Sequence, residues 1–335
     1  MKSFKQNDAG KQGGVSAVCF SKDESLVICG VKPDRSLSGF AKIYRIYNGK
    51  CVLTINCGFL GIVNSLCVSI DGRRLITAHS MSIQIWDIVS GSLESKWDCL
   101  SESSLESRRT YEKNAQPTNN GHTDSVRSVS VTPDNLHVVS GSCDSTIKVW
   151  NLYSGVVVFT FTGHSDGIES ICVSKDGRYV VSGSGDTTVK VWELNSGACV
   201  KTLTGHRYSV KSVCFSPDGC FIVSSGSTDH TIKIWEFKSG DCYFTISEGV
   251  KNVQSLSFSP DNRFVVSGDY RVVKIWDIAS GACVSTFDCY VHTKTADAYG
   301  GFQLGVCISK DGDRIITASE GMGGKDAAVN ILTFL

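Results

Sequence analysis

Short runs in which apolar and polar residues alternate recur along the whole chain, separated by turns rich in glycine and aspartate. The clearest copy has such runs at 168–173, 179–182, 188–192 and 199–203. Alternation over short runs, with Asp-Gly or Ser-Gly between them, predicts β-strands joined by tight turns. Each copy therefore predicts an antiparallel sheet of four strands, which needs neighbouring copies to cover its faces.

The third run of each copy ends on an aromatic or apolar residue at a nearly constant interval. Four of the six intervals are 41 to 43 residues long, and the two longer ones contain inserted segments. A period of about forty residues, with Gly-His at one end and Trp at the other, is the sequence signature of a propeller blade. The seven end positions are Tyr44, Trp86, Trp150, Trp192, Trp235, Trp276 and Leu332.

On these motifs the chain resembles the WD-repeat β-propeller family over essentially its whole length. The turn between the first two strands occurs seven times, but the turn before the fourth strand occurs only six times. Because an unclosed ring would expose two sheet edges, we expect residues near Ser3–Gln6 to supply the missing strand. The prediction is an all-β fold, a single seven-bladed β-propeller with four-stranded antiparallel blades, its ring closed by the N-terminal strand. The repeats span about 11–50, 58–97, 121–161, 163–203, 205–246, 248–287 and 299–335, with insertions at 98–120 and 288–301.

The resemblance also implies a buried, hydrogen-bonded tetrad in each regular blade, made of the Gly-His histidine, a strand serine, a turn aspartate and the tryptophan. A His, Ser and Asp set could instead act as a nucleophilic triad, but three copies in phase favour a structural network. In the third set either Ser224 or Ser225 fits the serine position, and we take Ser225. The three complete sets are His122, Ser140, Asp144, Trp150; His164, Ser182, Asp186, Trp192; and His206, Ser225, Asp229, Trp235.

Overall charge and hydropathy exclude several classes of partner. Lys+Arg and Asp+Glu number 33 each, so the chain carries no global charge that would recruit nucleic acid. The sequence has no run of 18 apolar residues and no apolar leader, so we expect neither a membrane span nor a signal peptide. These features predict a protein of the cytoplasm or the nucleus.

The fifteen cysteines follow the repeat rather than a disulfide framework. Cys19, Cys67, Cys172, Cys214 and Cys307 share one strand position, and Cys51, Cys199, Cys242 and Cys283 share another. A small side chain that recurs in phase predicts buried packing positions in a reducing compartment. Cys57, Cys99 and Cys289 could be considered as metal ligands, but they lie on separate loops and no Cys-x-x-Cys occurs, so we expect neither a metal nor a cofactor.

Residues that break the repeat are the best candidates for a binding site, because function resides on sites rather than on folds. The insertions 98–120 and 288–301 and the longer turns 31–40 and 319–327 all belong to one face, which we call the upper face. Segment 98–120 is polar, with serines around Arg108 and Arg109. It could be a regulated docking loop or a solvated insertion without a role.

Short connections on the same face carry bulky or charged residues of the kinds that anchor protein interfaces. Five or six of them should gather over the fifth and sixth blades. With the two arginines above, the expected partner-binding residues are Phe59, Arg108, Arg109, Arg207, Tyr208, His230, Lys251, Tyr270 and Arg271.

We therefore expect a non-enzymatic scaffold or adaptor that binds partner peptides or domains on its upper face. Kinase- or ribosome-anchoring propellers and ubiquitin-ligase adaptors are alternatives, although the latter usually carry Arg two residues after Trp-Asp, which Trp86 and Trp276 lack. An enzyme that uses the propeller channel is a third alternative. It is disfavoured because the chain has no Gly-x-Ser-x-Gly, no His-Glu-x-x-His and no P-loop.

Overall fold

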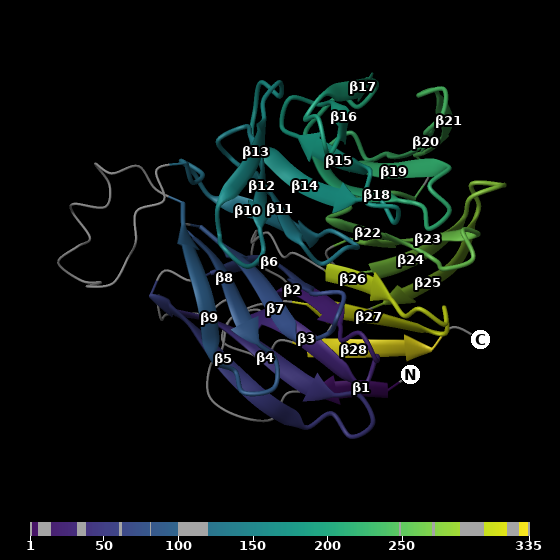
Figure 1. Ribbon diagram of the computed structural model, residues 1–335. Coiled ribbons are helices and arrows are strands. Elements are labelled where there is room, and N and C mark those ends of the chain that lie inside the picture. Colours follow the sequence, from purple (N-terminus) through teal and green to yellow (C-terminus); the bar gives the residue numbers. More distant parts are fainter. Residues whose placement is uncertain are drawn as a thin grey trace.

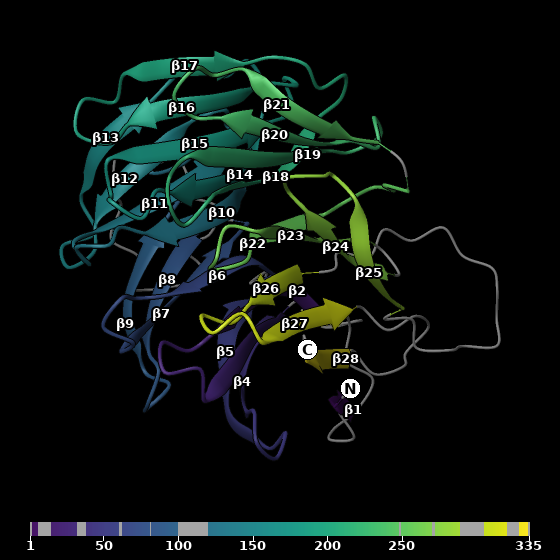
Figure 2. The ribbon, with the colours of Figure 1, turned by 90° about the vertical axis from the view of Figure 1, so that its right-hand side faces the viewer.

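In the computed structural model, which describes residues 2–5, 15–31, 38–59, 62–80, 82–99, 120–247, 249–269, 272–288, 305–319 and 328–333, the chain forms β-strands and no helix within those ranges. The strands make seven four-stranded antiparallel sheets, the blades, which stand side by side around one axis (Figures 1 and 2). The expectation of an all-β, seven-bladed propeller is confirmed.

Six blades each take four consecutive strands, ordered from the axis outward. Blades 1 to 3 comprise β2 (Val15–Phe20), β3 (Leu26–Val31), β4 (Ser38–Arg45), β5 (Cys51–Phe59); β6 (Val63–Val68), β7 (Arg74–His79), β8 (Ser82–Asp87), β9 (Leu93–Asp98); and β10 (Val126–Val131), β11 (His137–Ser142), β12 (Ile147–Asn151), β13 (Val157–Phe161). Blades 4 to 6 comprise β14 (Ile168–Val173), β15 (Tyr179–Ser184), β16 (Val189–Glu193), β17 (Cys199–Leu203); β18 (Val210–Phe215), β19 (Phe221–Gly226), β20 (Ile232–Glu236), β21 (Cys242–Ile246); and β22 (Ser255–Phe258), β23 (Phe264–Gly268), β24 (Val272–Asp277), β25 (Cys283–Asp288).

Blade 7 joins the two ends of the chain and closes the ring. Its inner strands are β26 (Gly305–Ile308), β27 (Arg314–Ser319) and β28 (Ala328–Thr333). The outermost strand is β1 (Lys2–Lys5), which pairs antiparallel with β28 in the register Lys2 to Ile331 and lies beside it in both ribbon views. Closure by the N-terminal segment is therefore confirmed, one residue earlier than the sequence suggested.

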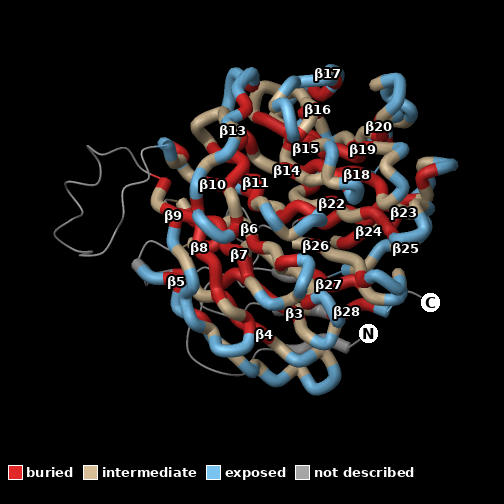
Figure 3. The backbone as a smooth tube through the Cα atoms, viewed as in Figure 1, coloured by how far each residue is buried: buried red, intermediate tan, exposed pale blue. Residues whose placement is uncertain are grey.

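Burial falls from the second strand of a blade to its outer strand (Figure 3). In blade 4, five of the six residues of β15 are buried, whereas β17 buries only its last residue. The second strand is covered on both faces by neighbouring blades, so it buries both its apolar residues, Val180 and Val181, and its polar ones, Ser182 and Ser184. The core therefore consists of seven joints between blades, each with its own apolar cluster.

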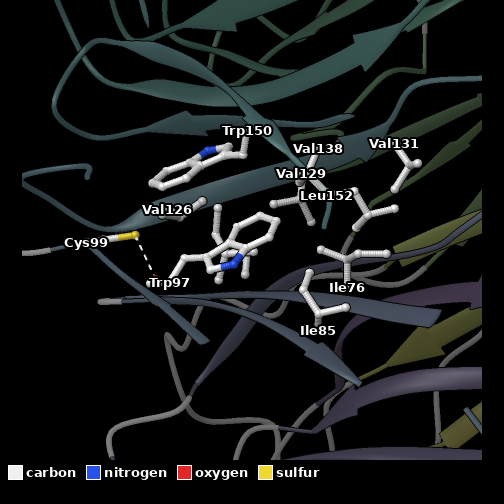
Figure 4. Close-up of a cluster of buried hydrophobic side chains, with 12 residues drawn as sticks. Ile76, Ile85, Trp97, Cys99, Val126, Val129, Val131, Val138, Trp150 and Leu152 are labelled. Carbon is white, nitrogen blue, oxygen red and sulfur yellow. Dashed lines mark hydrogen bonds between the residues drawn. The ribbon is translucent and has the colours of Figure 1, made fainter. Parts of the chain in front are cut away.

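Aromatic side chains fill the outer part of these joints. Trp97 of β9 stacks on Trp150 of β12, with ring centroids 5.5 Å apart and planes inclined by 14° (Figure 4). Phe161 stacks in the same way on Trp192 at the next joint, at 5.8 Å. Such pairs contribute about 0.5–1.5 kcal/mol each beyond the area they bury.

A line of serine hydroxyls ties the innermost strands to one another. In five successive joints, a serine of one blade accepts the backbone N–H of the next blade's first strand. The bonds run from Val129 to Ser65 (3.2 Å), Ile171 to Ser128 (3.1 Å), Val213 to Ser170 (3.2 Å), Leu256 to Ser212 (3.0 Å) and Val306 to Ser255 (3.2 Å). The innermost strands are thus fixed in register around the axis.

The two joints of blade 1 use different contacts. The position of the bonding serine is taken by Gly305 in blade 7 and by Ala17 in blade 1. Between blades 7 and 1, Arg314 instead pairs with Glu24 at 2.8 Å on the lower face. Between blades 1 and 2, the hydroxyl of Ser16 donates to the carbonyl of Val63. The joint of blades 7 and 1 is thus held by an ion pair, whereas the Ser16 bond has a counterpart in blade 2, where Asn64 Nδ2 donates to the carbonyl of Val126 at 2.8 Å.

The joint between blades 6 and 7 keeps a cavity of about 210 Å³ that opens at the lower face. Phe264, Ile275 and Ile308 contribute to its apolar wall. At the joint of blades 4 and 5 the rings of Tyr179, Phe215 and Phe237 contact one another, at 5.0 and 5.7 Å. Ile308 stands at the position of Phe215, and the residue in register with Phe237 is 334, outside the described residues. At this joint an aliphatic side chain therefore stands where blade 5 has an aromatic ring.

Candidate functional site

Three blades contain a continuous chain of buried hydrogen bonds. In blade 4, the indole N–H of Trp192 donates to Ser182 Oγ at 2.8 Å, and Ser182 Oγ lies 2.8 Å from His164 Nε2. The other ring nitrogen, Nδ1, lies 2.7 Å from Asp186 Oδ2. Blade 3 repeats these contacts with His122, Ser140, Asp144 and Trp150, at 2.7 to 2.8 Å.

Burial keeps the histidines of these tetrads neutral. It lowers the pKa of His122, His164 and His206, although an aspartate beside each ring acts in the opposite direction. Burial alone would raise the pKa of Asp186, but hydrogen bonds from Thr188 and His164 lower it to about 2. A neutral imidazole can donate from Nδ1 to the carboxylate and accept the serine hydroxyl proton at Nε2, so every polar atom of the chain is paired.

This geometry opposes a nucleophilic role for the tetrads. Ser140 and His122 are fully buried, and the serine hydroxyl already lies between the indole and the imidazole. A nucleophile must reach its substrate, which a hydroxyl enclosed by a tryptophan cannot do. We therefore interpret these residues as a structural network within each blade.

The third tetrad requires a correction. In blade 5, His206 Nε2 and the indole N–H of Trp235 meet Ser224 Oγ, at 2.7 and 2.8 Å, and His206 Nδ1 lies 2.8 Å from Asp229. Ser225, which the sequence favoured, is wrong because alternation along β19 turns its side chain to the opposite face of the sheet. There Ser225 Oγ donates to the carbonyl of Val253 in blade 6, at 3.3 Å.

Blade 2 contains a histidine that the sequence comparison missed. Phe59 occupies the usual position in the sequence, but His79 of β7 places its Nε2 2.8 Å from Thr77 Oγ1. The same hydroxyl accepts the indole N–H of Trp86 at 3.0 Å. The signal in the sequence was a histidine two residues after the strand threonine. Because both residues belong to β7, this imidazole reaches the threonine hydroxyl from the strand itself and not from the loop before the blade.

On the upper face, four predicted partner-binding residues come together over blades 5 and 6. The backbone N–H of Arg207 donates to Asp229 at 3.1 Å, and His230 follows Asp229 in the chain. His230 Nδ1 in turn accepts the backbone N–H of Asn252 at 3.3 Å, next to Lys251. Together with Tyr208, whose side chain is 53% exposed, these residues form what we call the basic–aromatic cluster: Arg207, Tyr208, His230 and Lys251.

The remaining predicted residues are not brought into this cluster by any described contact. Arg108 and Arg109, like most of segment 98–120, lie outside the described residues, as do Tyr270 and Arg271. Phe59 ends β5 of blade 1, and its side chain is not described. These five remain predictions.

The cysteines divide into two groups that the sequence treated alike. Cys19 and its four counterparts in the first strands are partly buried, in keeping with packing positions. The second group is a correction, because Cys199, Cys242 and Cys283 are exposed on the outer strands, which no neighbouring strand covers. Burial raises the pKa of Cys57 and Cys99 to about 12, as expected for small side chains packed in an apolar interior.

Seven blades and repeated buried networks define a β-propeller built from one duplicated unit. A family model for the WD domain, G-beta repeat, matches residues 49–87, 114–151, 155–193, 197–236 and 240–277, which together make up more than half of the chain. The chain therefore belongs to the WD40 repeat family. The first three strands of blade 1 and all of blade 7 lie outside these matches, and their third strands carry Tyr44 and Leu332 in place of tryptophan.

Several curated proteins share part of this sequence. Small ribosomal subunit protein RACK1 of Drosophila melanogaster is 35% identical over 149 residues, 44% of this chain and 41% of that protein. Autophagy-related protein 16 of Arabidopsis thaliana is 27% identical over 171 residues, 43% of this chain and 32% of that protein. A Ribosome biogenesis protein BOP1 homolog of Drosophila grimshawi is 52% identical over 40 residues, 12% and 5% of the two chains. Each match spans less than half of the relative's length.

The family and the fold fit a protein-interaction scaffold. Within the described ranges the structure offers no helix that could span a lipid bilayer. In the same ranges no three His, Cys, Asp or Glu side chains are grouped closely enough to hold a metal ion.

The corrected tetrad gives a paired stability test. Ser224→Ala leaves the His206 and Trp235 nitrogens without their buried partner, so we expect the free energy of unfolding to fall by about 1–3 kcal/mol. Ser225→Ala removes only the bond to Val253 and should cost about 1 kcal/mol or less. Urea denaturation of the two variants checks this, and an equal or larger loss for Ser225→Ala would restore the original assignment.

The neutral tetrad histidines predict a dependence of stability on pH. Their pKa values are lower in the folded than in the unfolded chain, so the unfolded chain binds more protons below the ordinary value of about 6.5. The stability they provide is complete above that pH and is lost as the pH falls toward about 5. Urea denaturation at both ends of this window should show the decrease, and His164→Gln, which cannot titrate there, should reduce it. Stability that is constant or rises on acidification would contradict this account.

Proposed function

We propose that this protein is a non-enzymatic scaffold that docks partner proteins or peptides through the basic–aromatic cluster on the upper face of blades 5 and 6. The observation that carries the proposal is the set of hydrogen bonds linking Arg207, Asp229, His230 and Asn252 across the two blades. Because these bonds fix the loops before a partner arrives, docking would cost little ordering entropy.

The side chains of the cluster suit an interface. Tyr208 offers a large, half-exposed ring, and Arg207 extends beside it into solvent. Tyrosine and arginine are enriched among the few residues that dominate binding energy at interfaces. The loop that carries them is held by the blade 5 tetrad through Asp229 and by the bond from Ser227 N–H to the Ser209 carbonyl, at 2.9 Å.

A location in the cytoplasm or nucleus accords with this role. All fourteen described cysteines are free thiols, which supports a reducing compartment. The names of two relatives, a small ribosomal subunit protein and a ribosome biogenesis protein, support it as well.

The docking site can be tested with a matched pair of exposed tyrosines on opposite faces. Tyr208→Ala should weaken capture of partners by about 5- to 30-fold, the effect of losing one interface anchor worth 1–2 kcal/mol. Tyr153, in the turn after β12 on the lower face, is 58% exposed, and Tyr153→Ala should retain capture. Affinity purification with quantitative mass spectrometry compares both variants with the unchanged chain.

A third variant lacking 100–119 separates this site from the insertion. Partners lost only in that deletion, and kept in Tyr208→Ala, would move the proposed site from blades 5 and 6 to the insertion after β9.

Association with ribosomes is a second candidate function, favoured by the 35% identity to a relative named a small ribosomal subunit protein. If this chain shares that association, it should co-sediment with small ribosomal subunits in sucrose gradients from cells of its own source. Tyr208→Ala and Tyr153→Ala, run in parallel, would show which face makes the contact. Sedimentation only as free protein would exclude this candidate and leave the scaffold proposal standing.

A further inference from the structure

Across blades 3 to 6, the charge of the exposed loop tips on the upper face changes from negative to positive. In these four blades, one position ahead of the first strand carries Asp124 in blade 3, Asp166 in blade 4, Tyr208 in blade 5 and Lys251 in blade 6. Arg207 adds a further positive charge beside Tyr208. All five side chains are exposed, so the variation lies where a partner would meet it.

The two acidic tips are anchored by bonds to their own backbone and form no direct ion pair with any residue that the structure describes. Asp124 Oδ1 accepts the backbone N–H of Ser125 at 2.6 Å, and Asp166 Oδ1 accepts that of Gly167 at 2.7 Å. Such local bonds hold the carboxylates in place at the loop tips. Among the described residues no lysine or arginine forms an ion pair with either carboxylate.

The basic tips are also free of ion pairs within the part of the chain that the structure describes. Arg207 and Lys251 point from loops that the His230 and Asp229 contacts hold together. The two cations therefore act together over blades 5 and 6, in a chain whose formal net charge is zero.

Of the charges deeper in the channel mouth, one pair crosses the boundary between the two halves and one cation lies near an acidic tip. Glu169 of blade 4 pairs with Lys211 of blade 5 at 2.7 Å, across the boundary between the two halves. Arg127 of blade 3 donates to the thiol sulfur of Cys143 at 3.0 Å and lies in the field of Glu169 and Asp124. The third strands carry one lysine in each of these blades and so add no asymmetry: Lys148, Lys190, Lys233 and Lys274.

We propose that the upper face orients its partner by charge. The partner is a protein segment that is acidic where it crosses blades 5 and 6 and basic where it crosses blades 3 and 4, with Tyr208 contacting an apolar residue between them. The inference rests on the proposed docking at the upper face and adds the chemistry and direction of the bound segment.

Electrostatic complementarity of this kind chiefly affects orientation and the rate of association. Exposed ion pairs add little affinity each, but opposite patches steer encounters and penalise the wrong arrangement. The effect reaches only about 10 Å at 0.1 M salt, so it must weaken as salt is added. Salt dependence therefore distinguishes charge-directed docking from contact through Tyr208 alone.

Two synthetic peptides of identical composition test the proposal on the full-length chain. One carries three glutamates at one end, three lysines at the other and a tryptophan between them, and the other alternates the same charges. Fluorescence anisotropy should show the block peptide binding several-fold more tightly at about 0.05 M salt, with the difference lost near 0.5 M. Equal binding of the two peptides, or binding of neither at low salt, would overturn the proposal.

Charge-reversed variants supply the internal controls. Arg207→Glu with Lys251→Glu should remove the preference for the block peptide, and so should Asp124→Lys with Asp166→Lys. The fourfold variant exchanges the two halves and should recover the preference, because the peptide can lie in the opposite direction. Failure of that recovery would contradict orientation by charge. If Tyr208→Ala still loses its partners while the peptides bind alike, docking at the upper face stands and this inference falls.

Discussion

The structure depends on how each blade attaches to the next, because a four-stranded sheet cannot bury both of its faces alone. Near the axis, a serine hydroxyl of one blade accepts a backbone N–H of its neighbour, as Ser170 does from Val213. Farther out, an aromatic ring of one blade stacks on the tryptophan of the next, as Trp97 does on Trp150. The hydrogen bond fixes the register of neighbouring first strands, and the stacked rings fill the space between the blades. Together they make seven marginal sheets into one body, with blade 1 joined by Arg314 and Glu24 instead.

The tetrads stabilise each blade from inside and connect that interior to the upper face. The aspartate that holds the histidine also accepts the N–H of the residue after it, Thr123 in blade 3 and Arg207 in blade 5. The loop tip is therefore a direct extension of the buried network. In blade 2 the buried hydroxyl of Thr77 is also paired, but its histidine partner, His79, comes from β7 and not from the loop before the blade. What recurs is therefore the paired hydroxyl and not the sequence position of the histidine.

The sequence was sufficient for the architecture because its period, its turns and its alternation all describe one repeated unit. It specified blade number, strand order and closure by the N-terminal segment, and it recognised the tetrads in blades 3 and 4. It failed where two neighbouring residues are identical and only the face of the sheet to which each side chain points tells them apart, as for Ser224 and Ser225. A serine does recur in the first strands of the sequence, but the hydrogen bonds that it accepts can be assigned only when the distance between neighbouring blades is known. Phasing cysteines against the repeat also could not tell a first strand from an uncovered outer strand such as β17.

The candidate site was predictable only in part, for a physical reason. Residues that repeat are selected by packing, so their pattern describes the frame, whereas a binding surface consists of positions where the pattern is free to vary. The sequence identified Arg207, Tyr208, His230 and Lys251 as such positions, and contacts between blades 5 and 6 gather them. It passed over Asp124 and Asp166 because an acidic loop tip after Gly-His looks regular within its own repeat. Only when the blades are set side by side does the change from these acidic tips to the basic tips of blades 5 and 6 become apparent. The same frame that makes the blades alike thus turns small differences at their tips into a change of charge across blades 3 to 6.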